Sequence, residues 1–178
     1  MRYELTTIED QILATLEANS DLSGVNIRTH VGEVNEANFQ DPAFAEGFVH
    51  LLPFVFVQYQ GKTIEGPDGR NSVGSLYFHK LKWRFFVGSR SLRDKKEAQR
   101  AAYPLLAAVY DSIHGKWPKS NLYTLASTLS KLEGTLITTV GFNPSSPMLA
   151  VPGDDESLIV NLPEIVVYSS DYSLRLMA

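Results

Sequence analysis

The sequence contains no cysteine among its 178 residues. Disulfide frameworks, thiolate nucleophiles and zinc sites with cysteine ligands are therefore excluded. No apolar run approaches the ~20 residues that a bilayer-spanning helix needs, so we expect a soluble protein. Glu4, Glu9 and Asp10 lie where an export signal requires a basic start and an apolar stretch. We therefore expect the protein to stay in the cytoplasm of the cell that makes it.

Recognisable catalytic motifs are missing as well. The sequence has no GxSxG elbow, no GxxxxGK[ST] phosphate loop and no GxGxxG after a strand. Its four histidines form no HExxH motif, and the acidic residues 154–156 lie in a Pro/Gly context typical of solvated loops. We predict no catalytic, cofactor-binding or metal-binding residues, and hence no enzyme. One alternative stays open, an enzyme whose site is assembled from scattered side chains such as Asp111 and His114.

What the chain does have is the composition of a folded globular protein. Hydrophobic residues make up 44% of it and charged residues 20%. At ~100 to 200 residues per domain, residues 1–178 are expected to form one domain.

Charge is distributed unevenly along the chain. Residues 1–50 carry two basic and nine acidic side chains, residues 80–100 carry eight and two, and residues 133–178 carry one and six. Half of all Lys and Arg thus lie in 21 residues, between two acidic arms. Such segregation favours self-assembly, in which the basic surface of one subunit meets the acidic surface of another. The alternative, that the acidic arms neutralise the basic stretch within one fold, is equally compatible with the sequence.

The first third of the chain predicts one helix and two strands. Thr6 and Glu9 form a capping box before an apolar periodicity, which predicts a helix over 7–19. Alternating apolar and polar residues predict a half-buried strand over 25–31. The aromatic and β-branched run 54–59 is apolar on both faces, as in a central strand.

A second, longer helix is expected near the middle of the sequence. Asp94 is a typical N-cap and is followed by Glu97 at the third helical position. Apolar residues then recur at helical spacing, and the helix should end by Gly115. Pro104 removes an internal hydrogen bond, so we expect a kink or break near residues 101–103.

Four further segments complete the prediction. Residues 61–74 contain four glycines and a proline, which predicts a long projecting hairpin tip. Residues 122–140 and 164–176 resemble strands, and the Pro-rich acidic segment 143–161 resembles a connection.

The strand expected over 73–87 carries a basic stripe. Lys80, Lys82 and Arg84 share one parity and therefore one face. The other parity is apolar and should face the core: Leu81, Trp83, Phe85 and Val87. Basic residues interleaved with aromatic ones also suggest nucleic-acid binding. Because Trp83 and Phe85 point away from the cations, we do not expect sequence-specific binding of nucleic acid.

The order and spacing of these segments resemble the Mu-like prophage tail terminator family. The likeness covers most of the chain and rests on five segments: the Thr7–Leu13 helix, the Leu52–Val57 strand, the Trp83–Arg90 strand leading into Leu92 and Arg93, the helix with Tyr103, Leu105 and Leu106, and the Val166–Tyr168 strand. The resemblance implies a small α+β fold with a mixed, mostly antiparallel twisted sheet, helices on one face and a long projecting hairpin.

The resemblance also implies a structural function. Proteins of this family form a hexameric ring that caps the tail tube, stops its polymerisation and provides the head-tail joining surface. The expected partners are further copies of the chain, the tail tube protein, the sheath and the head connector, with DNA passing through the ring. The protein would act in the host cytoplasm during assembly and reside in the virion tail. A different neck or baseplate component of the same particle is the alternative.

A ring of identical subunits needs a head-to-tail interface, and the charge pattern suggests its two sides. We predict interface residues in three segments. The basic stripe and the residues that follow it contribute Lys80, Lys82, Arg84, Arg90 and Arg93, and the hairpin tip contributes Lys62 and Arg70, with Glu65 and Asp68 nearby. The first acidic arm contributes Glu33 and Glu36, with Asp41 and Glu46 nearby.

Overall fold

In the part of the chain that the structure describes, six strands form one open mixed sheet and the helices α1 (Leu5–Glu17) and α3 (Lys95–Ile113) pack against it, which makes a single-domain α+β fold. The computed structural model describes residues 5–35, 38, 41, 44, 47–65, 78–115, 148–153, 155–162 and 164–177. The predicted strand over 122–140 and the hairpin tip beyond residue 65 lie outside the described residues. No helix in the described part of the chain is long and apolar enough to cross a membrane.

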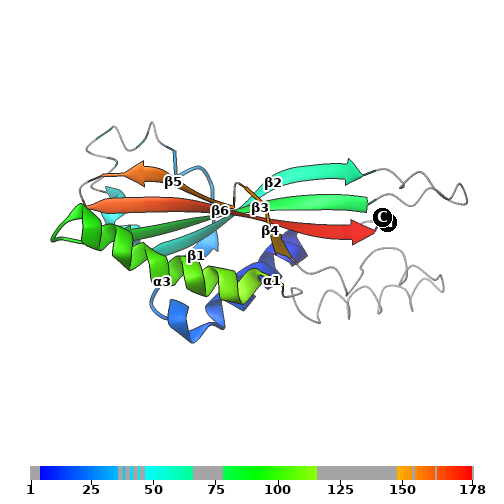
Figure 1. Ribbon diagram of the computed structural model, residues 1–178, viewed down its shortest axis with the longest axis horizontal. Helices are drawn as coiled ribbons and strands as arrows, with labels where there is room; N and C mark the ends of the chain where they lie inside the picture. Colours follow the sequence, from blue (N-terminus) through cyan, green and yellow to red (C-terminus); the bar gives the residue numbers. More distant parts are fainter. Residues whose placement is uncertain are drawn as a thin grey trace, which may run out of the picture.

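The elements follow one another as shown in Figure 1. Their bounds are α1 Leu5–Glu17, β1 Asn26–Thr29, β2 Phe54–Glu65, β3 Phe78–Arg90, α3 Lys95–Ile113, β4 Leu149–Ala150, β5 Glu156–Asn161 and β6 Ile165–Met177, with short 3-10 turns at Ser20–Leu22 and Val49–Leu51. The strand order is β1-β2-β3-β6-β4, and β5 also pairs with β6. Among the strand pairs of the described residues, β1 and β2 are parallel and the others are antiparallel. The predicted mixed, mostly antiparallel sheet is confirmed.

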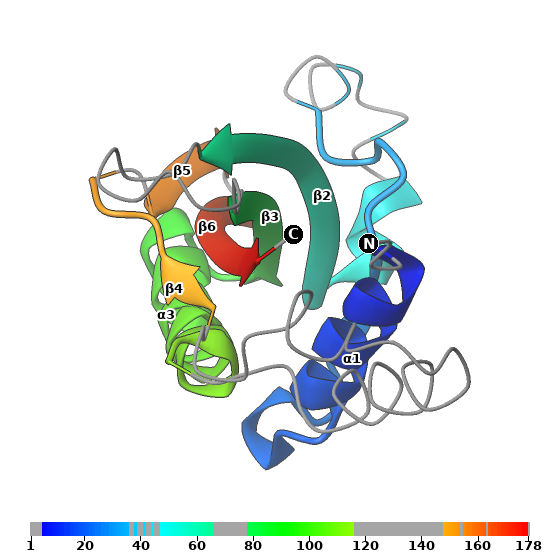
Figure 2. The ribbon, with the colours of Figure 1, turned by 90° about the vertical axis from the view of Figure 1, so that its right-hand side faces the viewer.

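The sheet carries a hydrophobic core on each face. The helix-side core joins α1 and α3 to one parity of the strands, and its largest fully buried members include Trp83, Phe85 and Tyr172. Figure 2 shows α1 and α3 on the same side of the curved sheet, as the resemblance implied. The second core lies on the opposite face, where Phe48 and its neighbours cover Phe54 and Phe56. Both faces of β2 are therefore buried from Phe54 to Val57, which explains the continuous apolar run.

Helix α1 differs from the prediction at its start. It already includes Leu5 and ends at Glu17, so Thr6 lies inside the helix and the predicted capping box is wrong. The Glu9 carboxylate instead accepts a 2.5 Å hydrogen bond from the Thr29 hydroxyl and so connects α1 to β1.

Helix α3 begins as predicted and is not interrupted by its proline. The Asp94 side chain accepts a 2.8 Å hydrogen bond from the Glu97 N–H, which confirms the N-cap, and His114 caps the other end. The predicted break is wrong, because the helix continues through Pro104. Pro104 is exposed, whereas Ala102 and Leu106 on the buried side keep the helix packed on the sheet.

Three predicted boundaries in the sheet also change. Strand β2 continues to Glu65 beyond a bulge at residue 60, where Gly61 adopts a φ of +106°, so residues 61–65 are strand rather than hairpin tip. Strand β3 ends at Arg90 instead of residue 87. The segment 143–161 is not only a connection, because β4 and β5 both pair with the edge of β6. The predicted strand over 164–176 is confirmed by β6.

Candidate functional site

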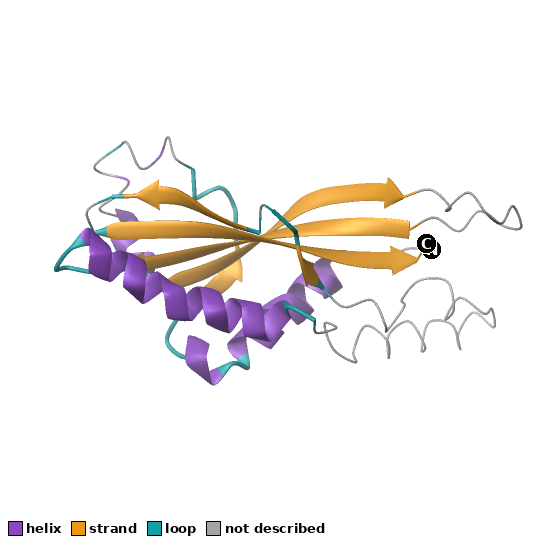
Figure 3. Cartoon of the chain, in the orientation of Figure 1, coloured by secondary structure: helices purple, strands orange, loops and turns teal. Residues whose placement is uncertain are grey.

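Strands β2, β3 and β6 extend past both helices as a three-stranded arm (Figures 1 and 3). We define the arm as β2 from Gln58, β3 up to Arg84 and β6 from Asp171. Strand β1 pairs with β2 only as far as Val57, so the outer edge of β2 has no strand partner along the arm among the described residues. On the helix side the arm is buried at Leu81, Trp83 and Leu174, so the side chains that it presents lie mainly on its opposite face.

The arm carries a basic face on the side opposite the helices. Cross-strand partners lie on the same side of an antiparallel sheet, so the register decides which side chains share a face. Arg84 lies opposite Asp171, Lys82 opposite Ser173 and Lys80 opposite Arg175. We call Lys80, Lys82, Arg84 and Arg175 the basic face.

Arg84 is neutralised within the subunit. Its Nε and Nη2 atoms each donate a 2.7 Å hydrogen bond to one oxygen of the Asp171 carboxylate. This bidentate geometry is the strongest form of an Arg–carboxylate pair, and the hydrogen bond raises the pKa of Arg84 further. The pair fixes β3 against β6 where the arm begins. Arg84 therefore contributes less net charge to the basic face than the sequence suggested.

Lys80 and Lys82 keep their charge available. Lys82 is exposed and Lys80 half-buried, and neither forms an ion pair with a residue that the structure describes. Like charges at neighbouring cross-strand positions repel, so this surface gains from an external anion or carboxylate.

Lys62 does not belong to the basic face. Its cross-strand partner is Leu81, which places it on the helix side of the arm. There it lies close enough to His79 to lower the pKa of that histidine, in addition to the larger effect of burial. The bulge before Gly61 changes the parity of β2, which is why alternation along the sequence does not reveal the face of Lys62.

Arg90 and Arg93 lie at the opposite end of the molecule. Six residues separate Arg90 from Arg84 along β3, about 20 Å in an extended strand. The interval is not basic, because Phe86 is buried in the second core. Arg90 forms a 3.6 Å ion pair with Glu164, and Arg93 a 3.8 Å pair with Glu97. The predicted interface residues of β3 and its C-terminal flank therefore lie in two separate patches, one at each end of the strand.

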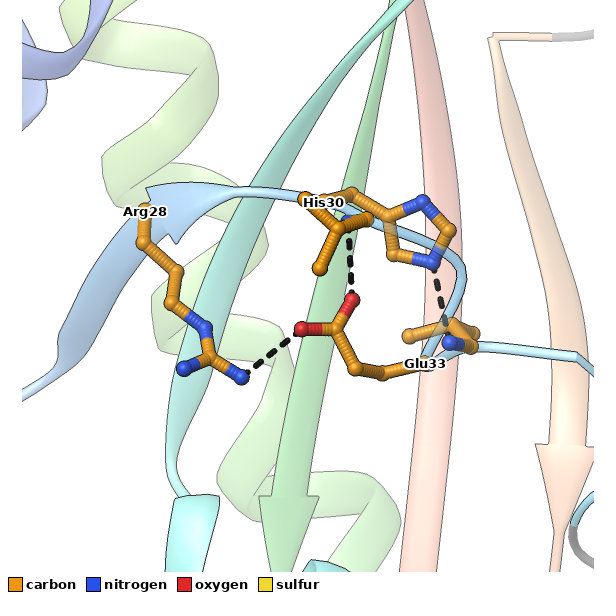
Figure 4. Close-up of polar contacts among 5 residues, drawn as sticks. Arg28, His30 and Glu33 are labelled. Atoms are coloured by element: carbon orange, nitrogen blue, oxygen red, sulfur yellow. Dashed lines mark hydrogen bonds and ion pairs between the residues drawn. The ribbon is translucent and has the colours of Figure 1, made fainter.

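Glu33 is used inside the subunit (Figure 4). One of its oxygens accepts a 2.9 Å hydrogen bond from Arg28, and the other accepts a 2.8 Å bond from the Val31 N–H. The Arg28 guanidinium also lies 4.6 Å from the centre of the Phe56 ring. Glu33, Arg84, Arg90 and Arg93 thus each form an ion pair within the subunit, as expected if opposite charges neutralise one another inside one fold.

His30 completes this loop. Its Nε2 accepts a 2.9 Å hydrogen bond from the Val34 N–H, while its ring packs 4.5 Å from that of Phe86. Burial lowers the pKa of His30, and Arg28 adds to this effect while Glu33 opposes it. The neutral ring holds the start of the connection that covers the second core.

Several predicted residues cannot be assigned to a face. Glu36, Glu46, Asp68 and Arg70 lie outside the described residues. Sequence reasoning also missed two members of the arm surface, Asp171 and Arg175. Arg175 is the one basic residue after position 132, and its parity in β6 is the signal that would have identified it.

Asp111 and His114 form no hydrogen bond or ion pair with each other. His114 Nδ1 accepts a 3.1 Å hydrogen bond from the Ala150 N–H and so attaches β4 to the end of α3. No group of three His, Asp or Glu side chains in the described part of the chain is placed to hold a metal ion.

No protein-family model matches the sequence, and no curated protein matches it either.

Proposed function

We propose that this chain is a structural subunit of a phage or prophage tail, a tail terminator that assembles into a ring of six copies. The ring caps the tail tube, stops its polymerisation and offers its other face to the head connector, and it resides in the virion neck. The protein acts by non-covalent assembly and does not convert a substrate chemically.

The observation that carries the proposal is the exposed arm with its basic face. The arm projects past the helices, and Lys80 and Lys82 form no ion pair with any described residue. An extended surface of this kind suits docking on another subunit, because its charges gain little from their own fold. The order of segments in the sequence, which resembles tail terminators, directs this general assembly function to the tail tube.

The experiment is native mass spectrometry combined with negative-stain electron microscopy of the purified chain. We expect a closed ring, and a K80E/K82E variant that assembles less well than wild type. The variant K95E/K96E is the matched control, because it makes the same charge change at two exposed residues of the first turn of α3.

A second measurement tests termination itself. The ring should bind the end of tubes formed by the tail tube protein from the same genome and prevent their elongation. A chain that remains monomeric at all concentrations contradicts ring formation. A ring that ignores tube ends contradicts termination and favours another neck or baseplate component.

A further inference from the structure

A groove lies between α3 and the start of β5, on the helix side of the sheet. It has a volume of about 350 Å³, and its lining combines aromatic, small apolar and acidic side chains: Tyr103, Leu106, Ala107, Tyr110, Asp111 and Glu156. The five helical members recur at positions i, i+3, i+4, i+7 and i+8, so they form one stripe along the outer flank of α3. We call this feature the acidic groove.

The two aromatic walls of the acidic groove are exposed yet held in place. Tyr103 is 53% exposed and Tyr110 41% exposed, which is high for such large rings. Tyr110 stacks on His114 with 4.4 Å between ring centres and an interplanar angle of 14°. Tyr103 lies 6.3 Å from the ring of Tyr168 on β6. Since these neighbours restrict both rings, a ligand that binds between them has less side-chain entropy to remove.

The acidic groove carries two carboxylates, and no Lys or Arg is among its described lining residues. Asp111 and Glu156 are both exposed, and neither forms an ion pair with a residue that the structure describes. Burial raises the pKa of the nearby Tyr172 to about 12, and the negative charges of Glu156 and Asp155 raise it further.

This combination of groups is suited to a basic side chain. A Lys or Arg offers an aliphatic stem that packs against Leu106 and Ala107, and a cationic head that can contact carboxylates and tyrosine faces. An acidic or purely apolar side chain would leave Asp111 and Glu156 without a partner.

We propose that the acidic groove of one copy binds the basic face of the arm of a second copy, with Lys80 and Lys82 facing Asp111 and Glu156. The proposal rests on the proposed ring and names the contact that holds it. The charges match in number, since each side presents two groups without an ion-pair partner among the described residues.

The two surfaces cannot meet within one subunit, because they lie on opposite faces of the sheet. Lys82 lies opposite Ser173 on the face away from the helices, whereas Glu156 pairs with Ser170, which lies opposite Phe85 on the helix side. A contact between two different patches is head-to-tail, and it closes into a ring when the rotation between subunits allows closure. The copy that inserts its arm still has a free groove for the next.

Charge exchange tests this pairing. K80E/K82E and D111K/E156K should each lose the oligomer in native mass spectrometry at a concentration where wild type is fully assembled. An equimolar mixture of the two variants should recover it, because each reversed surface then meets its complement on the other variant. A single chain carrying all four substitutions should also assemble.

Controls separate loss of contact from loss of folding. Lys82, Asp111 and Glu156 are exposed and Lys80 is half-buried, so circular dichroism should show wild-type secondary structure for each variant. The milder D111N/E156Q variant keeps the shape of the groove and should still weaken assembly. K95E/K96E should assemble like wild type.

The outcomes distinguish the contact from the ring. If wild type forms rings that both reversal variants also form, or if the mixture fails to recover assembly that each variant has lost, the groove pairing is wrong while the ring stands. If wild type remains monomeric, both the pairing and the proposed function are wrong.

Discussion

Replacing Gly88 by alanine tests the packing of the second core. Gly88 lies opposite Phe54 in the β2–β3 register, and the Phe54 ring occupies the position where a Cβ would be. The ring is fully buried, stacks on Phe56 at 4.1 Å and meets Phe48 edge-on at 5.1 Å. It therefore has no open space into which it can move.

The expected cost follows from this geometry. Added methyl groups in packed cores cost about 1–3 kcal/mol. Because the overlap here involves ring carbons fixed by two further aromatic rings, we expect about 3 kcal/mol for Gly88→Ala. At about 2–4 °C per kcal/mol for a chain of this length, the Tm should fall by about 6–12 °C. Urea unfolding followed by tryptophan fluorescence measures the loss directly, since Trp83 is fully buried.

A double-mutant cycle provides the control. Phe54→Leu removes part of the ring, so G88A/F54L should be more stable than the sum of the single losses by more than about 1 kcal/mol. If Gly88→Ala changes stability by less than about 0.5 kcal/mol, or if the two losses simply add, the described packing of Phe54 against β3 is incorrect.

Three other predictions concern single side chains. Burial keeps the pKa of His30 below its unfolded value near 6.5. The free energy of unfolding should therefore be constant above that pH and should fall on acidification until the folded ring also titrates. Urea titrations of wild type and His30→Gln between about pH 5 and 8 should show that the substitution removes part of this pH dependence. Asp171→Ala should lower the free energy of unfolding by more than about 1 kcal/mol, because it leaves the Arg84 cation unpaired. Adding Arg84→Met should recover part of that loss, and equal losses in the single and double variants would contradict the bidentate pair. Asp94→Ala removes the N-cap of α3 and should lower stability by about 1 kcal/mol in calorimetry, with Asp94→Ser close to wild type.

The sequence predicts those elements whose stability comes from local signals. The N-cap Asp94 and the alternation around Trp83 depend on neighbours within a few residues, and both predictions are confirmed. A break near residues 101–103 is wrong, because burial of the side of α3 opposite Pro104 outweighs one missing hydrogen bond.

The pairing of the strands cannot be predicted from a single sequence. Strands β4 and β5 are short, and their pairing with β6 decides that they are strands at all. The bulge at residue 60 moves Lys62 away from the basic face, and a one-residue shift of this kind leaves little trace in the sequence pattern.

The candidate site was predicted in part. Lys80, Lys82 and Arg84 do share a face, because alternation within one strand follows from backbone geometry. Their neighbours Asp171 and Arg175 come from β6, 87 residues away in the case of the Arg84–Asp171 bond, and only the tertiary register brings them together. The intramolecular use of Glu33 and Arg90 likewise depends on loop conformations.

The place of β6 in the sheet has a consequence for biosynthesis. It is the last strand of the described chain, yet it lies between β3 on one side and both β4 and β5 on the other. The sheet can therefore be completed only after Met177 has emerged from the ribosome, because β6 fills the place between β3 and the two strands β4 and β5. A nonsense mutation before Ile165 would leave the long edge of β3 uncovered, and the truncated product should aggregate or be degraded.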